Sequence, residues 1–561
     1  MSKKLIECVP NFSEGRDLNI IKQITDQIES VEGTKLLDVD AGNATNRTVV
    51  TFVGEPEQVV EAAFRAIKKA SELIDMSVHS GEHPRMGATD VCPFIPVANV
   101  SIEEAIEYSK KLAKKVGEEL DIPVFLYEYS ATKEDRRNLA TIRAGEYEGL
   151  EKKLQDPNWK PDYGSGKFNA KAGGTVIGVR DFLIAYNVNL NTKSVKKANS
   201  VAFDIREQGR VKRIGDPING QIVRDEQGNA IRVAGSLKNV KAIGWFIKEY
   251  DIAQISINLT NYKVTPLHVL FEETVKKATE RGLRVTGSEL VGMLPLEVMI
   301  ETGKFYLKQQ GRSAGVSEKE LVDIAIKSLG LNELYKFEPE KKIIEYALRD
   351  KTQQPLINMD LIAFADETAS ESPAPGGGSI SAYVGSLGVA LASMVANVSA
   401  NKKGWEDKIP FMSEYAEKAQ ILKDKLLNKV DEDTQAFNKI MEAFALPKNN
   451  DTEKKLRTES IQSATKNAIL VPFQVMELCY ESMELIKTMA EKGNPNSVTD
   501  AGVGALCART GVLGAYLNVK INCKSFDDKI FVENILQKAD EIFNLTKKAE
   551  DEILEIVNNL M

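Results

Sequence analysis

Residues 4–180 alternate short β-branched or apolar runs with longer segments whose apolar side chains recur every three to four positions. The first pattern is typical of strands and the second of amphipathic helices. Ser101 precedes one helical segment and Glu104 follows three positions on, which predicts a capping box. We expect strands in LIECVP, LLDVDAG, RTVVTFVG, ATDVCPFIPV and IPVFLYEYS, and helices in PEQVVEAAFRAIKKASELI and SIEEAIEYSKKLAKKVGEEL.

A similar order of elements returns after residue 181. Strand patterns in FLIAYNVNLN, AQISINLT and LRVTGSELV alternate with helical patterns near 193–208 and 266–281. The glycine-led runs GATDVCPFIPV and GSELVGMLPLEV resemble one another, so we predict two related α/β lobes, 1–180 and 181–335. Within the second lobe, residues 208–239 contain NG and QGN turn signals and predict an exposed hairpin excursion.

Beyond the second lobe the pattern becomes helical throughout. Helical patterns near 317–329 and 337–349 lead to a polar break that ends in Pro355, and we expect a linker over 336–356. The rest, 357–561, predicts an all-helical bundle, so the fold class is α/β plus all-α. Its helices are expected at 357–369, 379–400, 409–444, 452–491, 497–520 and 528–558.

Composition narrows the function classes. A chain of 561 residues needs about three to four folding units. Acidic residues outnumber basic ones by 81 to 73, so no basic excess is available for a nucleic-acid backbone. The apolar run 380–398 approaches the length of a membrane span, but Ser, Gly, Tyr and Asn dilute it, and we expect a buried helix and no membrane partner. Five scattered cysteines and no secretory pattern predict a cytoplasmic protein.

Two of the three histidines lie in the segment VHSGEHPRMGATD. Imidazole exchanges protons near neutral pH, which makes His83 a candidate acid and base, and the guanidinium of Arg85 could hold a substrate carboxylate. Asp38 and Asp40 are candidates to orient the imidazole ring. A solvated surface turn explains the segment equally well. Gly81 and Pro84 argue against a helix that would place His79 and His83 on one face, and no His or Cys in this segment completes a metal site with them, so no metal is expected.

Two glycine-rich segments are candidates for ligand binding. The loop 161–178 could line a flat heterocycle, although a flexible connection has the same composition. PAPGGGS (373–379) precedes a predicted helix, whose unpaired N–H groups can hold an anion or a carbonyl oxygen. Small residues also recur in the helical part and permit close helix packing, within one chain or between subunits.

One carboxylate in the helical part stands out by its spacing. Apolar or small side chains at helical spacing predict a buried stripe, and Asp433 falls within it, whereas Asp431 and Glu432 point elsewhere and can be solvated. The members of the stripe are Tyr415, Ala419, Leu422, Leu426, Val430, Phe437, Ile440 and Phe444. Burial would raise the pKa of Asp433 and suit it to proton transfer. A structural ion pair with another helix is the alternative.

Taken together, these motifs resemble the formimidoyltransferase-cyclodeaminase family over nearly the full length. ECVPNFSEG, GEHPRMGATDVCPFIPV and IRAGEYEGL resemble the transferase half, and PAPGGGS, VDEDTQAF and GAYLNV the cyclodeaminase half. The resemblance implies a transferase and ammonia lyase of histidine degradation. The first half would transfer the formimino group of N-formimino-L-glutamate to tetrahydrofolate. The second half would cyclise the product to 5,10-methenyltetrahydrofolate and release ammonia.

The resemblance also implies individual site residues. His83 would be the transferase acid/base and Asp433 the cyclodeaminase residue, with polyglutamylated tetrahydrofolate as co-substrate and a ring-shaped homo-oligomer, an octamer, as the assembly. Possible supporting residues are Asp40, Arg85, Gly376, Gly377 and Gly378. The folate-binding residues would be Gly164, Ser165, Gly166, Lys167, Phe168, Asn169, Ala170, Lys171, Ala172, Gly173 and Leu348.

Other functions remain open from the sequence. N-formylglutamate could replace the formimino donor, with the helical part acting as a methenyltetrahydrofolate cyclohydrolase. The chain could also be a non-catalytic folate-binding assembly protein.

Overall fold

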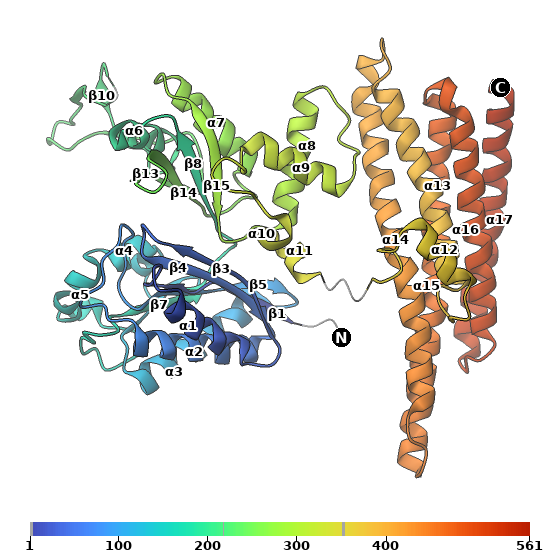
Figure 1. Ribbon diagram of the computed structural model, residues 1–561, viewed down its shortest axis with the longest axis horizontal. Coiled ribbons are helices and arrows are strands. Elements are labelled where there is room, and N and C mark those ends of the chain that lie inside the picture. Colours follow the sequence, from blue (N-terminus) through green and yellow to red (C-terminus); the bar gives the residue numbers. More distant parts are fainter. Residues whose placement is uncertain (1–3, 217, 350–353) are drawn as a thin grey trace. The chain divides into compact units, whose positions relative to one another are not determined.

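The computed structural model describes residues 4–216, 218–349 and 354–561 (Figure 1). The chain divides into two compact units, Met1–Thr302 with Ala325–Leu348, and Gly303–Ile324 with Arg349–Met561. The first is α/β and the second is helical, which confirms the predicted fold class. Within the expected linker 336–356, residues 339–348 instead form two short helices of the first unit, and residues 350–353 lie outside the described residues.

A seven-stranded mixed sheet forms the first lobe. Its strand order is β1-β4-β2-β5-β7-β6, with β3 paired to β4. β5, β7 and β6 run parallel, and the remaining pairs are antiparallel. The strands are β1 (Leu5–Cys8), β2 (Asn11–Phe12), β3 (Thr34–Gly42), β4 (Arg47–Gly54), β5 (Thr89–Ala98), β6 (Val124–Glu128) and β7 (Thr175–Val179).

Each face of this sheet has its own apolar cluster. One face packs against α1 (Leu18–Glu29), α2 (Pro56–Leu73) and α3 (Ile102–Leu120), and the other against α4 (Leu139–Arg143) and α5 (Glu146–Leu154). Successive side chains of a pleated strand point to opposite faces of the sheet, so alternate residues of the strands belong to one cluster or the other. The expected cap is present: Ser101 Oγ accepts the N–H of Glu104 at 3.1 Å at the start of α3.

The second lobe is built on a four-stranded antiparallel sheet, in the order β13-β14-β8-β15. α6 (Val195–Ile205) packs on β13 and β14, and α7 (Leu267–Thr279) packs beside α6. The strands are β8 (Ile184–Leu190), β13 (Val240–Ile247), β14 (Ile252–Leu259) and β15 (Val285–Val291); α8 (Leu296–Gln309), α9 (Glu318–Leu329), α10 (Pro339–Lys342) and α11 (Ile344–Leu348) follow.

The predicted excursion 208–239 is a small arm of two short β-ladders. β9 pairs with β12 and β10 with β11, and the arm extends beside α6 (Figure 1). The strands are β9 (Arg210–Val211), β10 (Arg213–Ile214), β11 (Gln221–Ile222) and β12 (Arg232–Val233).

Long helices make up the second unit. α13 packs between α14 and α16, and glycines allow this closeness: a Cβ on Gly388 would lie 2.6 Å from the carbonyl oxygen of Gly504. These small residues therefore serve packing within the chain. The helices are α12 (Leu361–Ala369), α13 (Gly377–Ala400), α14 (Ile409–Ala445), α15 (Asp451–Lys492), α16 (Val498–Cys523) and α17 (Lys529–Leu560).

The apolar helix α13 contains the run 380–398. Among the described residues it is the one helix whose length and composition would suffice to cross a membrane, and 61% of its most apolar window is buried inside the protein.

The end of α14 and the start of α15 extend past the other helices as an antiparallel pair (Figure 1). For this reason Phe437 and Phe444, which the periodicity predicts in the buried stripe, are 41% and 50% exposed. The stripe is buried only as far as the bundle surrounds it, at Leu422, Leu426 and Val430.

Candidate active sites

His83 lies half-buried in the loop that leads into β5. Its Nδ1–H donates to the carbonyl oxygen of Pro84 at 2.7 Å, so the neutral ring carries its proton on Nδ1 and presents the lone pair of Nε2. Burial and then the charges of Arg47 and Arg143 lower the pKa of His83 to about 3. The ring is therefore a neutral proton acceptor at physiological pH.

Two largely buried arginines share one carboxylate beside this histidine. Arg47 Nη1 and Arg143 Nη2 each donate to Oδ2 of Asp90 at 2.6 Å, and Oδ1 accepts the N–H of Met86 at 2.9 Å. Burial alone would raise the pKa of Asp90, but the two guanidinium groups outweigh it and hold the pKa at about 2. The cluster thus carries two positive charges and one negative charge.

Arg85 forms ion pairs outside the cluster around Asp90. Its guanidinium pairs with Glu148 at 2.6 Å and Glu146 at 3.2 Å, and its Nε donates to Nδ1 of His79 at 3.3 Å. Two carboxylates already compensate its charge, so the expected carboxylate-binding role of Arg85 does not fit its surroundings. These side chains line a polar hollow of about 430 Å³ on the flank of the His83 loop.

Asp38 and Asp40, which the sequence suggests for orienting the imidazole ring, also have other partners. Asp40 accepts the N–H of Gly292 at 2.9 Å, and Lys342 lies 3.0 Å from Asp38 and 3.3 Å from Asp40. Asp38 and Asp40 therefore tie β3 to the second lobe and to α10, and the carbonyl oxygen of Pro84 orients His83 in their place.

The end of the predicted folate segment 164–173 lies beside the His83 loop. Ala88 N donates to Ala172 O at 2.8 Å, and Gly174 N donates to Met86 O at 3.1 Å. The crossing requires glycine: a Cβ on Gly87 would lie 2.3 Å from Gly174 O, and Gly173 has φ +68°. Near the middle of the segment, Phe168 contacts Tyr147 with ring centroids 5.5 Å apart.

Leu348 lies apart from that segment in the contacts of the described residues. It ends α11, where Lys35 Nζ on β3 donates to the carbonyl oxygen of Ala347 at 2.8 Å. The structure therefore brings His83 and the 164–173 segment together and leaves Leu348 with β3.

The second site lies where α14 meets the start of α13. Asp433 faces the first turn of α13: its Oδ2 lies 3.2 Å from Ser379 Oγ, and Ser379 Oγ donates to Val430 O at 2.8 Å. Burial raises the pKa of Asp433, and the contacts from Ser379 offset only part of that rise. The carboxyl group is therefore biased toward its protonated form.

The predicted glycines form the helix start that Asp433 faces, and Gly378 is the one recorded against its carboxyl group. Gly376 is the N-cap of α13, and a Cβ on Gly378 would lie 2.2 Å from Asp433 Oδ1. A Cβ on Gly377 would lie 3.4 Å from Nδ2 of Asn518, which brings α16 to the same place. The site therefore joins an acid, a helix N-terminus and an amide.

Asp431 contradicts the expectation that it is solvated. It is 2% exposed and accepts the N–H groups of Leu356 and Ile357 at 2.9 and 3.2 Å. Asp431 thus fixes the chain that enters the bundle, and it is a structural carboxylate.

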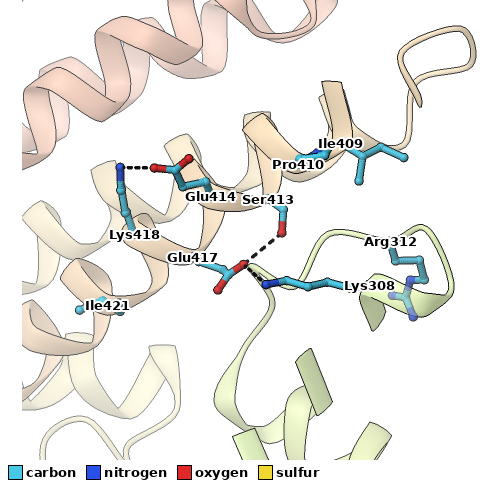
Figure 2. A pocket seen from close by; sticks show the side chains of 9 residues that line it. All are labelled: Lys308, Arg312, Ile409, Pro410, Ser413, Glu414, Glu417, Lys418 and Ile421. Atoms are coloured by element: carbon cyan, nitrogen blue, oxygen red, sulfur yellow. Dashed lines mark hydrogen bonds and ion pairs between the residues drawn. The ribbon is translucent and has the colours of Figure 1, made fainter. Parts of the chain in front are cut away.

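A larger hollow in the second unit, of about 610 Å³, contains neither predicted catalytic residue (Figure 2). Most of its charged side chains pair with each other, Glu417 with Lys308 and Glu414 with Lys418, and Ser413 Oγ donates to Glu417. It ends at Ile421, about 18 Å along α14 from Asp433 at 1.5 Å per residue. Among the residues that the structure describes, no group of three or more His, Cys, Asp and Glu could hold a metal ion.

Four residues of the two sites lie within motifs of the sequence, but the sequence predicts no role of their own for them: Arg47, Arg143, Ser379 and Asn518. Arg47 opens a strand and Arg143 ends a short helix, and only the fold brings them to Asp90. One usable signal was the position of Arg47 in an otherwise apolar strand, because a buried arginine needs an acidic partner.

Comparison with known proteins identifies both halves. The family model for the formiminotransferase domain, N-terminal subdomain, matches residues 5–180; that for the formiminotransferase domain matches 185–349; and the formiminotransferase-cyclodeaminase model matches 360–541. A formimidoyltransferase-cyclodeaminase of Dictyostelium discoideum is 42% identical over 559 residues, and that of Mus musculus is 40% identical over 559 residues. Both alignments cover 99% of each chain.

A shorter relative matches the helical part alone. A methenyltetrahydrofolate cyclohydrolase of Methylorubrum extorquens is 37% identical over 202 residues, which are 36% of this chain and 97% of its own.

Proposed function

The chain belongs to the formimidoyltransferase-cyclodeaminase family, the bifunctional enzymes of histidine degradation and folate metabolism, and we propose that His83 and Asp433 are its two catalytic residues. Its activities are glutamate formimidoyl transfer and formimidoyltetrahydrofolate cyclodeamination, with N-formimino-L-glutamate and tetrahydrofolate as substrates. The observation that carries the assignment is a proton acceptor in one compact unit and a shielded acid in the other.

In the transferase site, N5 of tetrahydrofolate attacks the formimino carbon. A tetrahedral intermediate forms, and Nε2 of His83 accepts the proton that N5 loses. The imidazolium returns this proton to the amino nitrogen of glutamate as the bond between that nitrogen and the formimino carbon breaks. A neutral histidine with its proton held on Nδ1 is in the correct starting state for this step.

In the cyclodeaminase site, N10 attacks the formimino carbon already bound to N5. The proton of N10 passes to the imino nitrogen, so the resulting ring carbon bears an amino group, and the carboxyl group of Asp433 then donates a second proton to that group. The C–N bond then breaks, ammonia leaves, and the 5,10-methenyl cation remains. A raised pKa keeps this carboxyl group protonated at higher pH than a solvated aspartate.

We propose the 164–173 segment as part of the folate site of the transferase. Its support is the main-chain contact between residues 86–88 and 172–174, which places one end of the segment beside the loop of His83. The aromatic pair Phe168 and Tyr147 offers a surface on which a pterin ring can stack.

The experiment follows each half-reaction separately. His83→Ala should abolish glutamate release and leave cyclisation of supplied 5-formiminotetrahydrofolate intact, and Asp433→Ala should do the reverse. Full transfer by the His83 variant would reject the first assignment, and unchanged ammonia release by the Asp433 variant would reject the second.

A second candidate for the helical unit is hydrolysis of the methenyl product. The similarity to the Methylorubrum extorquens protein, whose name states that activity, favours testing it. Methenyltetrahydrofolate should persist in the presence of the purified protein, and its rapid loss without ammonia release would favour the cyclohydrolase.

We also propose that the protein works in the cytoplasm as a ring-shaped homo-oligomer, an octamer, on polyglutamylated folate. The support for subunit contact is an apolar line along one side of α16 at helical spacing, formed by side chains that the other helices of the unit leave exposed; its members are Val503, Leu506, Leu513, Leu517 and Ile521. Leu517→Glu should lower the mass measured by light scattering, whereas an unchanged mass would exclude this face.

A further inference from the structure

The cluster of Arg47, Asp90 and Arg143 has an unbalanced charge in a buried place. The side chains are 7%, 0% and 13% exposed, respectively. Both guanidinium groups use the same oxygen of Asp90, so one positive charge remains uncompensated within the cluster. A buried charge is costly unless it is paired, and it therefore favours an anion as ligand.

Hydrogen bonding in the cluster is incomplete as well. Arg143 Nε is buried and has no hydrogen-bond partner, and among the described residues Asp90 is the one acceptor recorded for Arg143. Arg47 has one further bond, from Nε to Asn11 Oδ1 at 3.1 Å. Arg143 thus keeps planar donors of the kind that bind a carboxylate with two hydrogen bonds.

A similar cluster in the second lobe differs from this one because one of its arginines is fully hydrogen-bonded. There, Asp204 pairs with Arg210 and Arg281, but through different oxygens. Arg281 also donates from Nε to Ser200 Oγ at 2.7 Å and from Nη1 to Lys277 O at 2.8 Å. Every nitrogen of Arg281 therefore has a partner, which is typical of an architectural arginine.

We propose that Arg47 and Arg143 form the carboxylate subsite of the transferase and bind one of the two carboxylates of N-formimino-L-glutamate beside His83. The inference rests on the proposed function of His83. Arg85, which the sequence favours for this role, is already neutralised by Glu146 and Glu148.

The charge of the subsite also affects the basicity of His83. With the subsite empty, the two arginines disfavour the imidazolium form of His83. A bound carboxylate cancels the remaining positive charge, so the substrate itself makes His83 a stronger base at the moment when a base is required.

Binding without turnover tests the proposal directly. N-formimino-L-glutamate is titrated calorimetrically into the full-length protein with no folate present, so no transfer can occur. Arg143→Gln should weaken binding about 10- to 100-fold, the range for loss of a charge-assisted hydrogen-bond pair. Arg281→Lys, which alters an arginine whose nitrogens are all partnered, is the matched control and should bind normally.

A second arm uses kinetics and separates the two possible sources of the carboxylate. In Arg143→Gln, KM for N-formimino-L-glutamate should rise, while KM for tetrahydrofolate and cyclisation of supplied 5-formiminotetrahydrofolate stay unchanged. A rise confined to tetrahydrofolate would assign the cluster to the glutamyl tail of the folate and overturn the proposal.

Folding and the role of His83 are controlled independently. An unchanged KM for tetrahydrofolate in the transfer reaction shows that the lobe carrying Arg143→Gln is folded, and Arg143→Lys provides a milder variant if it is not. His83→Ala should still bind N-formimino-L-glutamate, so loss of its turnover bears on the proposed function alone. Normal binding by both Arg143 variants, or no binding by the unsubstituted protein, would overturn the subsite.

Discussion

Gly378 leaves just enough space for Asp433: a Cβ on Gly378 would lie 2.2 Å from Oδ1 of the carboxylate. The first turn of α13 can approach the acid only because that position has no side chain. Asp433 belongs to α14, Ser379 to α13 and Asn518 to α16, so three helices meet at this point.

Gly378→Ala should therefore abolish ammonia release without changing glutamate release, because the new methyl group displaces the carboxyl group of Asp433. Gly149→Ala in α5 is the control, since no atom lies within 4 Å of its added Cβ and it stands outside the cyclodeaminase site. Ammonia release is measured on supplied 5-formiminotetrahydrofolate. Equal activity of the two variants would show that Asp433 is not held against Gly378.

The transferase should respond similarly to a methyl group at the crossing of its two segments. A Cβ on Gly87 would lie 2.3 Å from Gly174 O and 2.5 Å from Ala172 O, so Gly87→Ala should separate the His83 loop from the 164–173 segment. KM for tetrahydrofolate should rise and kcat for transfer should fall, by about tenfold or more each, because a small displacement of positioning groups has large kinetic effects.

Gly149→Ala serves as the control for that variant. No atom lies within 4 Å of its added Cβ, and it stands inside α5. Alanine there should leave transfer unchanged and stabilise the helix by about 0.5–1 kcal/mol. If Gly87→Ala behaves like this control, the crossing does not organise the folate site.

The pH dependence of transfer should reflect the low pKa of His83. Its neutral form acts as the base, and a pKa of about 3 keeps it neutral as the pH falls from 8 to 5. The free-enzyme profile, kcat/KM, should therefore show no loss from protonation of His83 in that window. Arg143→Gln removes a positive charge and should move the acidic limb upward. A limb near pH 6.5 in the unsubstituted protein would contradict this environment for the ring.

Asp431 should behave as a structural residue. Replacement by Ala leaves the N–H groups of Leu356 and Ile357 without their acceptor, which should reduce the stability of the helical unit by about 1–3 kcal/mol. Urea unfolding monitored by helical circular dichroism measures the loss. Asp433→Ala, two residues away on the same helix, should be less destabilising, and the opposite order would exchange the two roles.

Local patterns predicted most elements because they depend on periodicity and capping. The helix expected at 409–444 is Ile409–Ala445, and the strand expected in RTVVTFVG is Arg47–Gly54. Periodicity does not show where a helix leaves its neighbours, so it placed Phe437 and Phe444 in a buried stripe that ends at Val430. The same limit concealed the burial of Asp431, whose partners lie more than 70 residues earlier in the chain.

The sequence also predicted the candidate catalytic residues better than it predicted their surroundings. His83 and Asp433 stood out by chemistry and spacing, but their surroundings depend on long-range contacts. Arg85 was the nearest arginine to His83 in sequence and pairs with Glu146 and Glu148, while Arg47 and Arg143, distant in sequence, meet at Asp90. Charge compensation in the fold, which the sequence does not display, decides which arginine is available for a ligand.

The most direct test mixes two inactive variants in one coupled assay. N-formimino-L-glutamate and tetrahydrofolate are supplied to His83→Ala, to Asp433→Ala and to an equal mixture, and glutamate, ammonia and methenyltetrahydrofolate are followed together. We predict that the first variant releases neither glutamate nor ammonia, that the second releases glutamate alone, and that the mixture forms methenyltetrahydrofolate. Conversion of both substrates to methenyltetrahydrofolate by either variant alone would contradict the assignment of one proton-transfer residue to each unit.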